Sequence, residues 1–194
     1  MSPRRLDSYR RKRDFRRTPE PRGGRRRASA PRFVIQKHAA TSLHYDFRLE
    51  VGGVLRSWAV PKGPSTDPRE KRLAMPTEDH PVEYADFEGV IPEGEYGAGT
   101  VIVWDRGTYR TIPGDDGEDA AAALDRGHLK VRLEGEKLRG GYALTRTGGN
   151  GRERWLLVKI DDDDADRRRN PVSTRPKSVV TGRTLEEVAA EEGA

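Results

Sequence analysis

The residues best suited to chemistry in this chain lie between positions 38 and 48. His44 and Asp46 are two residues apart in a run that alternates polar and apolar side chains. On a β-strand such residues project from one face, about 6.5–7 Å apart at the backbone, so both can reach one ion. His38 lies six residues earlier, across a small Ala-Ala-Thr-Ser loop that can fold it back to the same point. Two imidazoles and one carboxylate are typical of a catalytic Mn²⁺, Fe²⁺, Co²⁺ or Zn²⁺ site. A solvated strand face is the alternative.

Arg48 continues the same polar face, one pair beyond Asp46. A cation and a fixed guanidinium together favour phosphate as the substrate group. Lys62 and Arg72 add positive charge nearby, although each alone is typical of an ordinary surface residue.

His80 is followed by proline, which restricts its backbone to extended geometry and can aim the ring out of a loop. It is a candidate phosphate ligand or proton donor, with a hydrogen-bonded loop histidine as the alternative. His128 has no charged constellation around it, and we interpret it as structural. The glycine-rich stretch 89–99 contains acids where a phosphate cradle needs amides and lysine, so it indicates tight turns.

The elements that must position these residues are short strands. In the run 44–51, Tyr45, Phe47, Leu49 and Val51 share one face, and Gly-Gly at 52–53 predicts a hairpin to a partner strand at 54–60. Further strands are expected at 32–36, 71–75, 86–91, 99–105, 107–112, 128–133, 140–146 and 154–160.

Helix is expected in only two places. One is residues 117–125, and the other is 184–192, with Thr184 as N-cap and Glu187 at the capping-box position. Many short strands with little helix predict a mainly β fold, a compact antiparallel β-barrel with one or two short helices and a basic N-terminal arm. A β-sandwich is the alternative.

The 194-residue chain has an uneven charge distribution. Residues 1–32 contain 13 Lys and Arg against three Asp and Glu, whereas the remaining 162 contain 24 against 29. A basic arm of this kind indicates phosphate contacts with nucleic acid, with a solubilising tail as the alternative. Cysteine is absent, and no run of 18 apolar residues or secretory signal is present, so we expect a cytoplasmic protein without disulfides.

Several long motifs resemble one known family, the 3′-phosphoesterase module of bacterial DNA ligase D, which serves non-homologous end joining. They are FVIQKHAATSLHYDFRLE at 33–50, WAVPKGP at 58–64, HPVEY at 80–84, FEGVIP at 87–92, GEYGAG at 94–99 and WLLVK at 155–159. The similarity spans roughly residues 7–160, and the segment SVVTGRTLEE at 178–187 resembles the linker into a ligase domain. No polymerase or ligase motif is present, so we expect a stand-alone version or an excised fragment.

The resemblance implies a β-barrel whose active site lies in a groove on its polar surface. It implies Mn²⁺-dependent removal of a 3′-terminal ribonucleoside from DNA, followed by hydrolysis of the 3′-phosphate to a 3′-hydroxyl. The family's metal ligands fall on the three residues that spacing indicates, His38, His44 and Asp46. Its phosphate-contacting and catalytic residues fall on Arg48, His80 and Tyr84, with Lys62, Arg72 and Gln36 in support.

The resemblance also assigns Arg13, Asp14 and Glu20 of the arm to the diesterase step. We therefore expect residues 1–31 to form a basic arm whose part from about Tyr9 to Pro21 folds over the site. The barrel is expected at 32–160, and a charged linker with a terminal helix at 161–194.

Two other functions fit parts of this pattern. His44-x-Asp46 with a later His80 is the ligand order of Fe(II)/2-oxoglutarate oxygenases, although residues 85–95 lack the arginine they require. A non-catalytic nucleic-acid-binding adaptor of end joining is the other alternative. Expected partners are DNA 3′ ends, a primer-template with a terminal ribonucleotide, and end-joining proteins such as Ku and a ligase. We expect a monomer without a membrane partner, associated with the nucleoid when bound to DNA.

Overall fold

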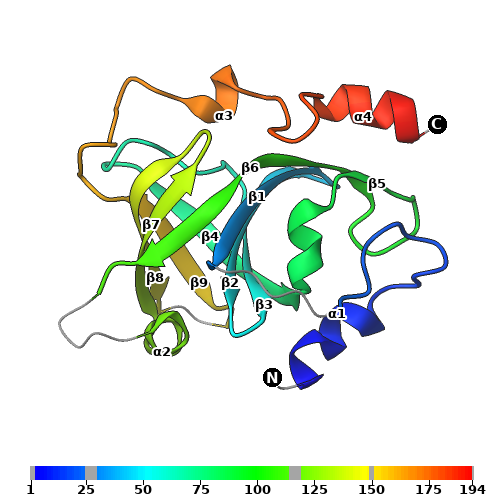
Figure 1. The fold of residues 1–194 in the computed structure, drawn as a ribbon, viewed down its shortest axis with the longest axis horizontal. Coiled ribbons are helices and arrows are strands. Elements are labelled where there is room, and N and C mark those ends of the chain that lie inside the picture. Colours follow the sequence, from blue (N-terminus) through cyan, green and yellow to red (C-terminus); the bar gives the residue numbers. More distant parts are fainter. Residues whose placement is uncertain (1–2, 25–29, 114–118, 149–150, 194) are drawn as a thin grey trace.

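Nine antiparallel strands dominate the part of the chain that the computed structural model describes, residues 3–24, 30–113, 119–148 and 151–193. The strands are β1 (Arg32–Ala39), β2 (Leu43–Val51), β3 (Val54–Val60), β4 (Lys71–His80), β5 (Gly89–Ile91), β6 (Gly99–Thr111), β7 (His128–Gly135), β8 (Arg139–Thr147) and β9 (Arg154–Lys159). Eight of them close into a barrel in the order β1-β2-β3-β4-β9-β8-β7-β6, because β6 pairs back onto β1 (Figure 1). β5 adds to the edge of β6. The predicted barrel is confirmed.

The barrel interior is apolar because its strands alternate. On β2, Tyr45, Phe47, Leu49 and Val51 all join the main core, together with Trp58 from β3. The Gly52-Gly53 turn connects the two strands with positive φ angles of 60° and 81°, which glycine adopts without strain. The predicted hairpin is therefore confirmed.

A second apolar layer covers the outside of β1 and β6. Val34 and Val101 point away from the barrel interior and pack with Tyr9 of the N-terminal segment and with Tyr84 and Phe87. Tyr84 belongs to the 3₁₀ helix η2 (Val82–Asp86). Polar residues on this outer face, such as Asp46, are consequently buried between two layers instead of exposed to solvent.

The described residues contain four short α-helices, more than the one or two expected. They are α1 (Asp7–Arg11), α2 (Ala120–Arg126), α3 (Pro171–Thr174) and α4 (Leu185–Glu192), and a 3₁₀ turn, η1 (Pro3–Leu6), precedes α1. The two helices that sequence analysis missed, α1 and α3, have only four or five residues and show no apolar period. The N-terminal start of the helix expected at 117–125 falls partly outside the described residues. α4 has the predicted capping box between Thr184 and Glu187.

The predicted break between two strands near Gly107 is wrong. Residues 99–111 form a single strand, β6, instead of two. A Cβ on Gly107 would lie 2.0 Å from the carbonyl oxygen of Glu134, so this glycine permits close backbone approach and does not end the strand. Two other boundaries differ: β4 continues to His80 instead of ending near residue 75, and residues 82–86 form η2 ahead of the short β5.

The C-terminal segment runs back along the barrel (Figure 1). Lys137 donates hydrogen bonds to the carbonyls of Arg175 and Lys177, and Trp104 donates to Arg175. Val188 of α4 packs on Ile102 of β6. Among the described residues, no helix combines the length and the apolar character needed to cross a membrane.

Candidate metal and phosphate site

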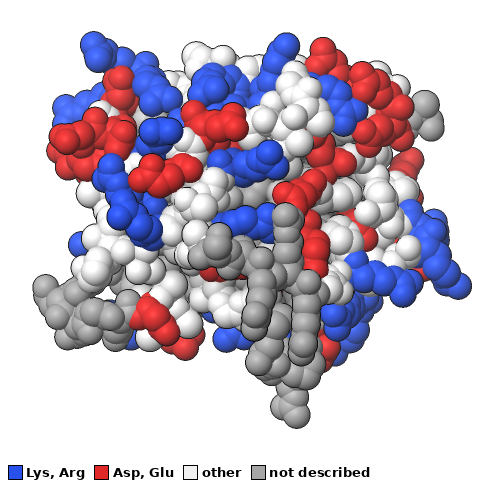
Figure 2. Space-filling model, in the orientation of Figure 1, with Lys and Arg blue, Asp and Glu red and all other residues white. Residues whose placement is uncertain are grey.

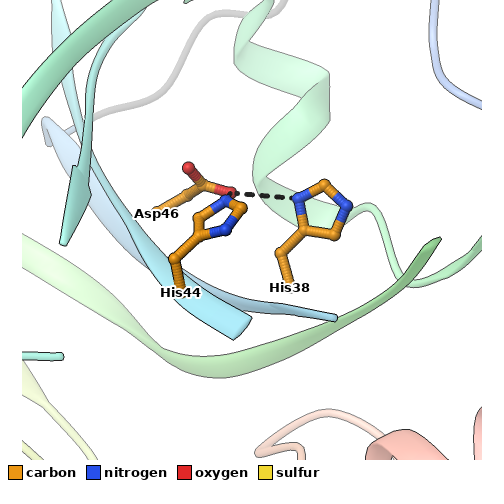
Figure 3. A group of neighbouring side chains, drawn as sticks. All are labelled: His38, His44 and Asp46. Atoms are coloured by element: carbon orange, nitrogen blue, oxygen red, sulfur yellow. Dashed lines mark ion pairs between the residues drawn. The ribbon is translucent and has the colours of Figure 1, made fainter. Parts of the chain in front are cut away.

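Three side chains with metal-ligating atoms converge near the turn that joins β1 and β2. His38 and His44 are directly paired across the two strands, and Asp46 lies two residues further on β2. The Oδ2 atom of Asp46 lies 3.6 Å from His38 Nδ1 and 3.3 Å from His44 Nε2. Figure 3 shows the three side chains pointing toward one another. One ligand atom from each lies within 4.8 Å of the others, as the sequence spacing predicts for a metal site.

The outer nitrogens of the two rings decide which atoms face inward. His38 Nε2 lies 2.8 Å from the carbonyl oxygen of Gly97, and His44 Nδ1 lies 3.0 Å from that of Ser42. Carbonyls only accept, so each of these nitrogens carries the ring proton and donates. The inner nitrogens of the neutral rings then present lone pairs toward Asp46. Three acceptors facing one point are the donor set that a divalent cation satisfies, so these residues fit a metal.

The pKa shifts of Asp46 and His44 agree with a metal site formed by the trio His38, His44 and Asp46. Burial acts to raise the pKa of Asp46, but the Arg48 guanidinium and the two imidazoles hold it well below its usual range, so the carboxylate is ionised. Burial acts to lower the pKa of His44, and its bond to the Asp46 carboxylate outweighs this and raises the pKa. A proton therefore competes with a cation for the same position.

Arg48 connects the trio to its surroundings. Its Nε donates to Gln36 Oε1 at 2.7 Å, one terminal nitrogen lies 3.1 Å from His80 Nδ1, and the other lies 3.3 Å from Asp46 Oδ2. Gln36 in turn donates to the carbonyls of Tyr84 and Phe87. A guanidinium has five N–H groups, and these contacts use three of them. The other two N–H groups are not used by these contacts.

His80 is neutral in this environment. Burial, reinforced by the charges of Arg48 and Arg13, holds the pKa of His80 well below its ordinary value. Its Nδ1 lies 2.9 Å from the carbonyl oxygen of Glu78 as well as 3.1 Å from Arg48. The guanidinium only donates and the carbonyl only accepts, so the two contacts compete for one ring nitrogen.

The N-terminal segment adds a second ionic cluster. Glu20 Oε1 accepts from Arg13 Nε at 2.8 Å and from the Tyr84 hydroxyl at 2.9 Å. Burial, and next the charge of Glu20, raise the pKa of Tyr84 well above its usual value, so the hydroxyl keeps its proton. The Arg13 guanidinium lies 3.9 Å from the centroid of the Tyr9 ring. Residues 9–20 thereby pack on η2 beside the trio.

A cavity of about 310 Å³ joins these groups. Of the residues singled out in the sequence, the cavity lining contains the following: Arg13, His38, His44, Asp46, Arg48, His80 and Tyr84. Gln36 and Glu20 lie behind this lining and hold Arg48, Tyr84 and Arg13 in place.

Three other candidates do not join the cavity lining. Lys62 is exposed after β3. Arg72 pairs with Glu70 at 2.5 Å near the start of β4. Asp14 pairs with Arg16 at 3.0 Å, and its hydrogen bonds to Arg16 lower its pKa to about 2. Their roles toward a substrate stay predictions.

Three further lining residues, not expected from the sequence, contact the candidate site residues or present a polar or aromatic group to the cavity. Glu78 pairs with Arg13 at 3.2 Å and with Lys12 at 3.3 Å. Tyr96 lines the cavity from the turn that precedes β6, and the carbonyl of Gly97 orients His38. Tyr96 and Gly97 stand in a segment that the sequence indicated as turns and as part of a family motif, with no role assigned to either residue, and Glu78 falls beyond the predicted end of its strand.

The geometry removes the main support for the oxygenase alternative. That reaction class would use His80 as the second imidazole ligand beside His44 and Asp46. In the described residues the imidazole that joins these two is that of His38, and His80 instead contacts Arg48.

Comparison with known proteins gives a consistent result. The family model described as "DNA Ligase D 3'-phosphoesterase domain" matches residues 36–146, which include the metal trio. The chain is 52% identical over 186 residues to the multifunctional non-homologous end joining protein LigD of Pseudomonas aeruginosa, covering 93% of this chain and 22% of that protein.

Two mycobacterial relatives match in the same way. The chain is 50% identical over 158 residues to the multifunctional non-homologous end joining DNA repair protein LigD of Mycobacterium tuberculosis, covering 80% of this chain and 20% of that protein. It is 45% identical over 164 residues to the LigD protein of Mycolicibacterium smegmatis, covering 81% and 21%. The chain thus spans about a fifth of the length of these relatives.

Proposed function

The chain belongs to the DNA ligase D 3′-phosphoesterase domain family, and from this premise we propose that it is a Mn²⁺-dependent enzyme that repairs DNA 3′ ends. It first removes a 3′-terminal ribonucleoside, which leaves a 3′-phosphate, and then removes that phosphate to give a 3′-hydroxyl. The observation that carries this proposal is the convergence of His38, His44 and Asp46 beside Arg48 in one cavity.

His38 Nδ1, His44 Nε2 and an Asp46 carboxylate oxygen would hold the cation. Bound there, Mn²⁺ would act as a Lewis acid toward a phosphate oxygen, and Co²⁺ or Zn²⁺ suit the same nitrogen and oxygen ligands. The tight hairpin between β1 and β2 fixes the separation of these ligands.

Arg48 binds the scissile phosphate with its two remaining N–H groups and stabilises the negative charge that develops on its oxygens. His80 is neutral, so it acts as a hydrogen-bond donor to phosphate and not as an imidazolium acid: when Nδ1 accepts from Arg48, the other ring nitrogen carries the proton. The Tyr84 hydroxyl stays protonated beside Glu20 and limits the space around the phosphate.

Both steps are hydrolyses at phosphorus. In the first, water attacks and the bond to the 5′-oxygen of the terminal ribonucleoside breaks. In the second, water attacks and the bond to the 3′-oxygen of the retained strand breaks. In each case the leaving oxygen takes up a proton and becomes a hydroxyl. We assign Arg13 and Glu20, which pack beside Tyr84, to recognition of the terminal ribonucleoside in the first step.

The exposed cations of the N-terminal segment support DNA as the substrate. Exposed Lys and Arg side chains there are Arg5, Arg10, Arg11, Lys12, Arg16, Arg17 and Arg22. Figure 2 shows basic side chains gathered on the side of the molecule where α1 and the N-terminal segment lie. Such a group binds a phosphate backbone without regard to sequence. Ku and a ligase of end joining are the proposed protein partners, and the cytoplasm with its nucleoid the proposed location.

A gel assay tests this function. A 5′-labelled primer ending in one ribonucleotide, annealed to a longer template, is incubated with Mn²⁺ or with EDTA beside a matching strand that ends in a 3′-phosphate. We expect Mn²⁺-dependent conversion of both strands to one 3′-hydroxyl product. Tight binding of both strands without turnover would instead establish the adaptor.

A further inference from the structure

One exposed aromatic side chain lies at the cavity and has no part in the chemistry described so far. Tyr96 lines the cavity together with the metal trio, and 47% of its surface is exposed. The other large apolar side chains that are exposed in the described residues are aliphatic, namely Leu43, Leu73 and Val180. Because an exposed ring adds little to the stability of the core, its position at the cavity favours a role in binding a ligand.

The backbone links Tyr96 directly to the metal trio. Gly97, the next residue, has a φ angle of 76°, and its carbonyl oxygen accepts the hydrogen bond from His38 Nε2. The same turn therefore orients a metal ligand and presents the ring. Because Tyr96 and Gly97 are consecutive residues, the backbone that presents the ring also carries the carbonyl that contacts His38.

Two cations of the N-terminal segment lie over the ring, which leaves the exposed part of the ring for a base. Lys12 Nζ lies 3.3 Å from the Tyr96 hydroxyl and 4.6 Å from the ring centroid, and the Arg13 guanidinium lies 5.3 Å from that centroid. Arg17 pairs with Glu95 at 3.0 Å, which ties the same segment to this turn. These contacts hold the tyrosine at the cavity although half of it faces solvent.

The size of the cavity limits what can reach the ring. A volume of about 310 Å³ is at the small end of the range of ligand pockets, so it admits one strand end and not a duplex. The part of the substrate that enters with the scissile phosphate is its terminal nucleoside. Aromatic rings in nucleic-acid-binding proteins stack on bases regardless of sequence.

We propose that Tyr96 is the platform on which the base of the departing 3′-terminal ribonucleoside stacks. The inference rests on the proposed function and extends it, because it assigns recognition of the leaving base to a residue outside the metal and phosphate groups. It requires Tyr96 to serve ribonucleoside removal and not the later removal of the 3′-phosphate, when no base remains beyond the phosphorus.

Three primers that differ only at the 3′ end test the proposal: a normal terminal ribonucleotide, an abasic terminal ribose, and a 3′-phosphate. We expect Tyr96→Ala to lower kcat/KM on the first by about tenfold to a hundredfold, the range that one base–aromatic stack supports. The other two strands should react at wild-type rates. Tyr96→Phe should retain activity because it keeps the ring, and Leu73→Ala is the matched control for loss of an exposed apolar side chain away from the cavity.

A binding readout separates this inference from the proposed function. With 2-aminopurine as the terminal ribonucleotide base, stacking quenches fluorescence in EDTA, where no turnover is expected. Quenching by the wild type and by Tyr96→Phe, but not by Tyr96→Ala, supports the platform even if the wild type hydrolyses none of the three strands. Quenching that does not depend on residue 96, or an equal loss of activity on all three strands, overturns it.

Discussion

His38 and His44 face each other as directly paired residues of β1 and β2, with ring centroids 4.9 Å apart. A three-residue loop at 40–42 joins the two strands next to this pair. Each ring donates outward to a backbone carbonyl, so the inward nitrogens and Asp46 are all acceptors. The hairpin thus brings together three side chains that could hold a metal ion, and Gly97 orients one of them.

Replacing Asp46 tests that donor set. Asp46→Asn removes the negative charge and should weaken Mn²⁺ binding more than about 100-fold, since even changes behind a metal ligand weaken binding about 10–100-fold. Isothermal titration with Mn²⁺ alone measures this without any substrate. Asp119→Asn is the matched control, because Asp119 caps α2 and asparagine caps equally well. Unchanged Mn²⁺ affinity in Asp46→Asn would refute the site.

Arg48 should not tolerate lysine. Lysine cannot contact Gln36, His80 and Asp46 together, and it lacks the forked N–H groups that bind phosphate. We expect Arg48→Lys to lower turnover of a 3′-phosphate strand by about 10²–10³, the usual effect of losing a donor to a developing oxyanion. Arg56→Lys is the control, because Arg56 pairs with Asp79 away from the cavity lining. Equal rates for both variants would contradict the role of Arg48.

Glu20 should separate the two hydrolyses. Glu20→Gln keeps the shape but weakens the bonds to Arg13 and Tyr84, which we assign to recognition of the terminal ribonucleoside. Ribonucleoside removal should fall about tenfold or more, because bonds to a charged group are worth about 1.5–3 kcal/mol, while 3′-phosphate removal changes little. Rates of the two steps on separate strands decide this, with Glu186→Gln on α4 as the control. Equal loss in both steps would contradict the assignment.

Two histidines should give folding stability opposite pH dependences in EDTA. Burial, and next the charge of Arg48, lower the folded-state pKa of His80 well below 6.5. The contribution of His80 to folding stability is therefore complete above about pH 6.5 and is lost as the pH falls from there. Burial acts to lower the folded-state pKa of His44, but the effect of Asp46 is larger and raises this pKa. Its contribution is therefore complete below about pH 6.5 and is lost as the pH rises.

Urea unfolding between about pH 5 and 8 measures both effects across the range in which histidine titrates. The stability lost in His80→Gln should grow with rising pH, and the stability lost in His44→Gln should shrink. The two variants serve as controls for each other. Parallel slopes would show that the environments assigned to these rings are wrong.

Sequence patterns that repeat or complete themselves within a few residues predict the elements that contain them. The alternation along β2 places Tyr45 and Phe47 inside the barrel and His44 and Asp46 on the other face, and the structure confirms this pattern. The capping box at Thr184 is likewise a local signal that the structure confirms.

Contacts between residues that are far apart in the sequence cannot be predicted from such local patterns. Gly97 orients His38 from 59 residues away, and Glu78 meets Arg13 from 65 residues away. Gly107 indicated a break because composition does not distinguish a turn glycine from one that allows close strand approach. Helix α1 has only five residues and no apolar period, and its Tyr9 is buried by packing against Tyr84 and Phe15. The assignments of Lys62, Arg72 and Asp14 to substrate binding, and the domain boundaries, stay predictions.

The most direct test of the central claim is a time course on a 5′-labelled primer with one terminal ribonucleotide, at saturating Mn²⁺, comparing the wild type with Asp46→Asn. The wild type should first accumulate a strand ending in a 3′-phosphate and then convert it to a 3′-hydroxyl, and Asp46→Asn should form neither product. Wild-type rates in Asp46→Asn, or products that form equally well in EDTA, would contradict the claim that His38, His44 and Asp46 hold the catalytic metal.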